Sequence, residues 1–124
     1  MKRRATGPRE TPVVKPRIRM MQGSEIVLGP GKADLLDALR ATGSLRKAAA
    51  ELRMSYMRAW QLVKTMNGAF RDPLVSLVRG GAAHGGATLT PSGERILGLY
   101  RSMERKSLKA AGPDAAALKR LLKR

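Results

Sequence analysis

Two short helices joined by a brief turn are predicted by residues 44–70, which read SLRKAAAELRMSYMRAWQLVKTMNGAF. Ser44 is placed to cap a helix over residues 45–52 and Ser55 a helix over residues 55–70, because a serine hydroxyl accepts a hydrogen bond from an N–H group at a helix start. Three alanines at 48–50 permit close approach where the helices cross. The pattern is typical of a helix-turn-helix, although a generic helical hairpin also tolerates alanines.

The segments after the second of these helices predict two strands. Residues 74–79 are rich in Val and Leu, and residues 87–89 supply a second short strand. Between them lies GGAAHGG, residues 80–86, which we expect to form a flexible loop. A strand, a glycine-rich loop and a strand directly after a helix-turn-helix predict a winged helix. The expected fold class is therefore mainly α with a small β wing.

Further elements are predicted upstream of this unit. Residues 32–42 have an apolar side and a charged side, and the helix that they predict ends at Gly43. The apolar side holds Leu35, Leu36, Ala38 and Leu39, and the charged side holds Asp34, Asp37 and Arg40. Before this helix, residues 17–28 predict a short hairpin or two weak strands.

A long C-terminal helix is predicted to begin at Thr90-Pro91, because a proline at the first helical position lacks only an N–H group that would stay unpaired there. We expect it to end at Gly112-Pro113. The helix carries more apolar surface than one small domain needs to bury, which favours a dimer contact. The predicted dimerisation residues are Ile96, Leu97, Leu99, Tyr100 and Met103.

The net charge of +16 is concentrated at the two ends of the 124-residue chain. Residues 1–19 hold seven basic groups and one acid, residues 101–124 hold eight and two, and the segment between them holds ten and six. Two basic arms that flank one domain favour a polyanionic partner, and double-stranded DNA is the partner we expect. A membrane surface suits the arms less, because they lack an apolar aromatic face.

The helix over residues 55–70 is predicted to read DNA with its outward face. At about 100° per residue, one side of this helix is apolar and packs on the other helices, while the opposite side presents Met57, Gln61 and Lys64. Glutamine can bind adenine through two hydrogen bonds, arginine binds guanine or phosphate, and lysine suits phosphate. The alternative is an ordinary solvated helix face. The predicted DNA-binding residues are Arg46, Ser55, Tyr56, Met57, Arg58, Trp60, Gln61, Lys64 and Arg79.

Two of these residues, Tyr56 and Trp60, lie one turn apart at the border between the two sides of the helix. An aromatic residue at such a border either covers the core or contacts DNA. The helical periodicity leaves both roles open.

Catalysis and metal binding are not expected. The chain has no Cys and one His, and its nine acids show no paired arrangement. Gly29-Pro30-Gly31-Lys32 resembles a phosphate-binding loop only superficially, because Ala33 lies where Ser or Thr is required. No apolar run approaches the ~18 residues that a membrane span needs. We therefore predict a cytoplasmic, nucleoid-associated protein that is not an enzyme and needs no cofactor.

Several of these motifs together resemble the N-terminal domain of the molybdate-responsive ModE regulators. The likeness covers about residues 17–105, and its helix-turn-helix part is also similar to LysR-type regulators. The residues that carry it are Thr42-Gly43-Ser44-Leu45, Ala48-Ala49, Met54-Ser55-Tyr56, Ala59-Trp60, Val63, Met66-Asn67, the loop 80–86, Leu89-Thr90-Pro91 and Leu99-Tyr100.

The resemblance implies a dimeric, sequence-specific transcription regulator built on a winged helix. Full-length members of that family carry C-terminal molybdate-binding modules, for which 124 residues leave no room. We therefore expect a stand-alone single-domain member that does not bind molybdate, although a link to molybdenum metabolism stays open. The alternatives are an architectural nucleoid protein that coats DNA without choosing sites, a protein-interaction adaptor and an oxyanion sensor.

The expected organisation has three parts. Residues 1–16 contain three prolines among basic residues and predict a disordered basic arm. Residues 17–110 predict the winged helix-turn-helix with its dimerisation helix. Residues 111–124 predict a basic tail, either a short helix or frayed.

Overall fold

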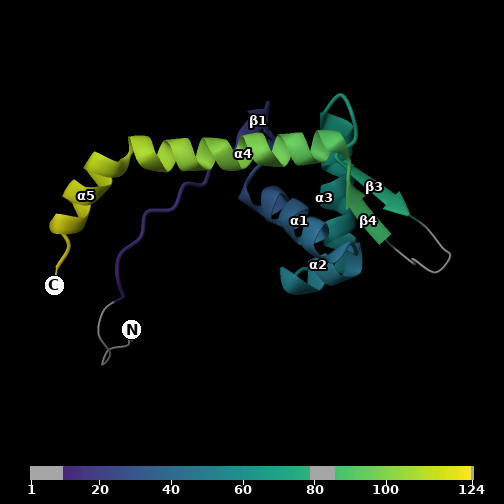
Figure 1. Cartoon of the computed structure of the whole chain (residues 1–124), viewed down its shortest axis with the longest axis horizontal. Coiled ribbons are helices and arrows are strands. Elements are labelled where there is room, and N and C mark those ends of the chain that lie inside the picture. Colours follow the sequence, from purple (N-terminus) through teal and green to yellow (C-terminus); the bar gives the residue numbers. More distant parts are fainter. Residues whose placement is uncertain (1–9, 79–85, 124) are drawn as a thin grey trace.

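The computed structural model describes residues 10–78 and 86–123. Helices and two-stranded antiparallel sheets alternate along this part of the chain (Figure 1). Their bounds are β1 Met20–Gln22, β2 Glu25–Leu28, α1 Pro30–Thr42, α2 Leu45–Glu51, α3 Tyr56–Ala69, β3 Val75–Val78, β4 Gly86–Leu89, α4 Pro91–Ala110 and α5 Gly112–Arg120. The predicted fold class, a mainly helical winged helix-turn-helix, is confirmed.

The N-terminal hairpin pairs β1 with β2 in antiparallel fashion. Its turn contains Gly23, whose φ of 63° is a left-handed conformation that glycine adopts at little cost. Val27 and Leu28 at the end of β2 are buried, whereas β1 is exposed. The hairpin predicted within residues 17–28 is thus present, and only its second strand contributes to the core.

Helix α1 begins at Pro30, two residues before the predicted start, because this proline occupies the first helical position. It ends at Gly43, whose φ of 68° allows its N–H group to bond the Leu39 carbonyl oxygen at 2.8 Å. The predicted apolar side of α1 is buried, with Leu35, Leu36 and Leu39 fully enclosed.

Helices α2 and α3 carry the serine caps that the sequence predicts. Ser44 Oγ accepts a hydrogen bond from the Lys47 N–H group at 3.1 Å, and Ser55 Oγ accepts one from the Arg58 N–H group at 3.0 Å. Ala48 and Ala49 are buried in α2, as close packing requires. The three helices enclose a core that includes Leu35, Leu36, Leu39, Leu45, Ala48, Ala59, Val63 and Met66.

The wing strands β3 and β4 pair in register from Val75 with Leu89 to Val78 with Gly86. The sheet also reaches the junction of α1 and α2, because the Ala87 N–H group donates to the Gly43 carbonyl oxygen at 3.0 Å. The wing is therefore joined directly to the start of the helix-turn-helix. The predicted loop 80–86 lies outside the described residues except for Gly86, which belongs to β4.

Helix α4 lies across the other helices and continues beyond them, with α5 at its far end (Figure 1). Thr90 fixes its start, because Oγ1 accepts from the Gly93 N–H group at 3.0 Å and donates to the Pro73 carbonyl oxygen at 2.6 Å. Tyr100 lies in the core, where Oη donates to the Ile18 carbonyl oxygen at 2.7 Å. Much of the segment predicted as a basic tail is helical.

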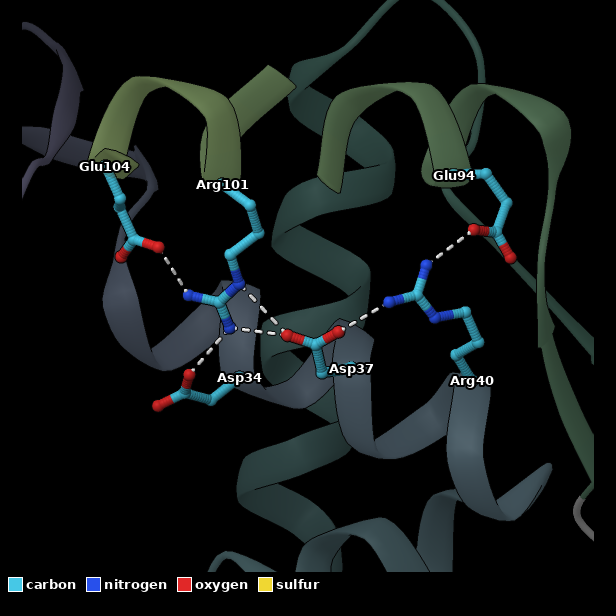
Figure 2. A network of polar contacts seen from close by, with 6 residues as sticks. All are labelled: Asp34, Asp37, Arg40, Glu94, Arg101 and Glu104. Carbon is cyan, nitrogen blue, oxygen red and sulfur yellow. Dashed lines mark hydrogen bonds and ion pairs between the residues drawn. The ribbon is translucent and has the colours of Figure 1, made fainter. Parts of the chain in front are cut away.

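Arg101 joins α4 to α1 through a network of ion pairs (Figure 2). Its guanidinium group contacts Asp34 at 2.9 Å and Asp37 at 2.6 Å on α1, and Glu104 at 2.8 Å on its own helix. Partial burial opposes the charge on Arg101, but hydrogen bonds to Glu104, Asp34 and Asp37 outweigh this effect and raise its pKa. The predicted charged side of α1 therefore faces α4 and holds it in place.

We expect Arg101→Gln to lower the free energy of unfolding by about 1 kcal/mol at low salt, since the network is partly exposed and screened by water. The difference from wild type should shrink at high salt, where exposed charges are screened. Urea unfolding at low and high salt measures both effects. Arg105→Gln on the exposed part of α4 is the matched control. An equal loss for both variants would contradict a structural role for the network.

Candidate nucleic-acid interface

The outward face of α3 is the exposed part of the helix-turn-helix. Ala59, Val63 and Met66 bury the opposite side of the helix in the core. Gln61 and Lys64 are exposed, as predicted from the helical periodicity. Met57 is 59% exposed beside them, and an apolar side chain left in water at this position is available for contact with a base.

A shallow depression lies on this face. It is lined by Arg58, Gln61, Leu62, Lys64 and Thr65. Hydrogen-bond donors and acceptors from Gln61 and Thr65 thus lie beside two basic side chains. Such a mixture suits base edges flanked by phosphates.

The start of α3 combines a cap with positive charge. The Ser55 hydroxyl oxygen accepts a hydrogen bond from the Arg58 N–H group, so this predicted DNA-binding residue caps α3. The exposed Arg58 side chain follows one turn later. A helix N-terminus with an arginine beside it favours the binding of an anion such as a phosphate group.

Two predicted residues, Tyr56 and Trp60, form one edge of the face. The Arg46 guanidinium carbon lies 5.3 Å from the centroid of the Tyr56 ring. The Lys64 ammonium nitrogen lies 4.9 Å from the centroid of the Trp60 ring. Tyr56 is 41% exposed, whereas Trp60 is half-buried against the core. Arg46 of α2 is in this way brought next to the residues of α3.

Lys32 is a basic residue close enough to Arg58 to feel its charge, and its burial was not predicted from the sequence. Its side chain is buried, and its ammonium group donates a hydrogen bond to the Ile26 carbonyl oxygen. Burial lowers the pKa of Lys32, the Glu25 carboxylate opposes this effect, and the positive charge of Arg58 adds to it. A lysine at the start of an amphipathic helix looks like a solvated residue in sequence, so no local signal marks its burial.

Asn67 near the end of α3 is the second residue whose role sequence reasoning missed. Its Oδ1 accepts hydrogen bonds from the Leu74 and Val75 N–H groups at 2.8 and 3.1 Å, and its Nδ2 donates to the Val75 carbonyl oxygen at 3.0 Å. One amide thereby fixes α3 to the start of the wing. A polar residue directly after the buried Met66 was the available signal.

Arg79, also predicted to bind DNA, lies outside the described residues. The other predicted DNA-binding residues lie on α2, on α3 and at the cap of α3. The contacts of the structure group most of these residues: Arg46 lies over Tyr56, Lys64 lies over Trp60, Arg58, Gln61 and Lys64 line one depression, and Ser55 bonds the Arg58 N–H group. Met57 is exposed on the same helix.

The residues predicted for a dimer contact divide into two groups. Leu97 and Tyr100 are each 1% exposed and pack in the core of the same chain, because they face the body of the domain on which α4 lies. Leu97 and Tyr100 are therefore not part of an exposed surface, contrary to the prediction that they form a dimer contact. Leu99 and Met103 remain exposed at 56% and 39%, with Ile96 half-buried beside the core.

These features define a winged helix-turn-helix with an exposed polar recognition helix, the architecture of a DNA-binding regulator. The chain belongs to the lysR family of bacterial regulatory helix-turn-helix proteins, whose profile matches residues 32–94. Because this is a family of regulators, the prediction that the chain is not an enzyme is confirmed. None of the helices within residues 10–78 and 86–123 is long and apolar enough to cross a membrane.

Proteins of three bacteria are similar to this region of the chain. The molybdenum transport protein ModE of Azotobacter vinelandii is 43% identical over 70 residues, which cover 56% of this chain and 26% of that protein. The molybdenum-pterin-binding protein MopB of Rhodobacter capsulatus is 42% identical over 77 residues, 62% of this chain and 28% of that protein. The DNA-binding transcriptional dual regulator ModE of Escherichia coli K12 is 33% identical over 97 residues, 75% of this chain and 37% of that protein.

The chain thus spans about a quarter to a third of the length of these relatives. Within that span it carries the helix-turn-helix of the ModE-type regulators, and the resemblance stated from its sequence is confirmed.

Proposed function

We propose that the protein regulates transcription as a dimer that binds specific DNA sites and reads the major groove with α3. The observation that carries this proposal is the outward face of α3. Gln61, Arg58 and Lys64 are exposed there beside Met57, on a helix fixed by a buried core and a serine cap. A helix of this kind fits the major groove with its N-terminal and outward side chains on base edges.

The distribution of charge supports the same proposal. The recognition face lies on a chain with a net charge of +16, most of it outside the central domain. Basic groups in both arms would add affinity for any DNA by neutralising phosphates and releasing counterions, so binding should weaken steeply with salt. The arms would thereby strengthen binding to any DNA, and α3 would determine which sequence is preferred.

A dimer would use the exposed apolar residues of α4. Leu99 and Met103 provide a surface next to the half-buried Ile96, and α4 is long enough to extend past the body of the domain (Figure 1). Two recognition helices related by two-fold symmetry would bind half-sites about one helical turn of DNA apart. The names of the relatives favour genes of molybdenum metabolism as targets.

The deciding experiment is selection from a random pool of duplex DNA with purified protein at near-physiological salt. We expect an enriched motif with two-fold symmetry. DNA retained without any enriched sequence would contradict site-specific regulation and favour the architectural role, which the basic arms also suit. An enriched motif without symmetry would contradict the dimer.

Arg58→Ala and Gln61→Ala should each reduce the preference for the selected motif by about 1–3 kcal/mol, since each removes a side chain able to make paired hydrogen bonds to a base. The measurement is binding to the selected duplex and to a scrambled duplex of the same composition. Lys64→Ala is the control for a phosphate contact. It should weaken binding to both duplexes equally and reduce the slope of log affinity against log salt by about one. Equal effects of all three variants on both duplexes would disprove the assignment of α3.

A further inference from the structure

Two exposed basic side chains, one on α2 and one on α3, lie over aromatic rings of α3. These are Arg46, with its guanidinium carbon 5.3 Å from the Tyr56 ring centroid, and Lys64, with its ammonium nitrogen 4.9 Å from the Trp60 ring centroid. The negative face of an aromatic ring attracts a cation within about 6 Å of the centroid. Both cations are therefore restrained on the same edge of the recognition face.

The rings are the partners that restrain these two side chains. In the described part of the chain the ion pairs all involve Arg40 or Arg101, so neither Arg46 nor Lys64 has a carboxylate partner there. Arg101 differs from them: it also lies 5.8 Å from a ring centroid, that of Tyr100, yet three acids bind its charge inside the protein. The charges of Arg46 and Lys64 remain available to a ligand.

Both rings are carried by the backbone of α3. Trp60 packs against the core, and Tyr56 stands in the first turn of α3 directly after its cap. They lie one turn apart along one edge of the helix, so the two cations are spaced along that edge. When a recognition helix lies in the major groove, its edges face the phosphates that line the groove.

Long basic side chains lose conformational entropy when a ligand orders them. A side chain that is already ordered in the free protein loses less on binding, so its contact contributes more affinity. Arg46 and Lys64 would therefore lose less conformational entropy on contact with a phosphate than unrestrained basic side chains would.

We propose that Tyr56 and Trp60 are positioning residues, which hold Arg46 and Lys64 toward the phosphates along one side of the major groove. The rings act on binding through these cations. This inference rests on the proposed DNA-binding function and assigns a role to two aromatic residues whose position on α3 allows either core packing or DNA contact.

The test is a pair of double-mutant cycles, with affinity measured as a function of salt on both the selected duplex and a scrambled duplex. One cycle combines Tyr56→Leu with Arg46→Ala, and the other combines Trp60→Leu with Lys64→Ala. Each single variant should lower affinity by about threefold to tenfold on both duplexes. In each cycle the ring variant should cost less than about twofold once its cation is gone, because coupled residues are not additive.

Tyr56→Phe keeps the ring and should retain near wild-type affinity, which separates loss of the ring from loss of the hydroxyl group. Tyr56 is 41% exposed, so its variants are expected to fold, and thermal unfolding checks this. Ring variants with the same loss in both backgrounds would overturn the inference, because they would act on DNA directly or through the fold. If the selection yields no motif, the same cycles are measured on a duplex of arbitrary sequence, and coupling there would uphold the inference while refuting site-specific regulation. Wild-type protein that binds neither duplex would overturn both.

Discussion

Gly93→Ala is expected to lower the free energy of unfolding by about 3 kcal/mol, because the new methyl group has no room. A Cβ atom at this position would lie 2.1 Å from the carbonyl oxygen of Leu74. That oxygen belongs to the backbone and also accepts a hydrogen bond from the Thr90 N–H group at 2.9 Å. The clash can be relieved only by moving the start of α4 away from the wing.

The matched control is Gly98→Ala in the same helix, where a Cβ atom would meet nothing within 4 Å. This variant should gain about 0.5–1 kcal/mol, because alanine loses less backbone entropy than glycine in a helix. Urea unfolding followed by circular dichroism compares the two. If Gly93→Ala were as stable as Gly98→Ala, the close contact between α4 and Leu74 would be absent in solution.

Asn67→Ala is expected to lower the free energy of unfolding by about 2–3 kcal/mol, because it leaves the N–H groups of two buried residues without the side-chain acceptor that they use. Those residues are Leu74 and Val75, which are 0% and 2% exposed. The amide also ties α3 to β3, so the wing should lose its fixed position relative to the recognition helix. We expect weaker binding to the selected DNA as well.

Asn67→Asp distinguishes the contribution of the side-chain oxygen, which accepts hydrogen bonds, from that of the side-chain nitrogen, which donates one. It keeps the oxygen that accepts from the two N–H groups, but it places a second oxygen against the Val75 carbonyl oxygen where the amide now donates. The variant should fold and be less stable than wild type. Chemical denaturation of both variants tests the assignment, which is wrong if Asn67→Ala loses less than about 0.5 kcal/mol, the range of an ordinary surface change.

Most of the fold could be predicted because its signals are local. Ser44, Ser55 and Thr90 each cap a helix, and Pro91 occupies the first position of α4. Capping and proline geometry depend on residues within one turn, so they are visible in the chain itself. The exposed face of α3 was likewise predictable, because a helix that buries Ala59 and Val63 must turn Gln61 outward.

The environment of single side chains was less predictable. The large apolar side chains of α4 were predicted to form a dimer contact, but Leu97 and Tyr100 belong to the core while Leu99 and Met103 face outward. Helical spacing shows that a side is apolar, but it does not distinguish a surface that packs within the chain from one that meets a partner. The sequence therefore could not show which of these residues are free to meet a second copy of the chain.

The amino-acid sequence alone determined the helix-turn-helix, its caps, the wing and the residues on the outward face of α3. Tertiary structure decided that Asn67 bonds the wing, that Gly93 lies against Leu74, that Arg101 pairs with Asp34 and Asp37, and that Lys32 is buried. The first set follows from the conformational preferences of neighbouring residues. The second depends on contacts between separate elements, which exist only after the core has packed them together.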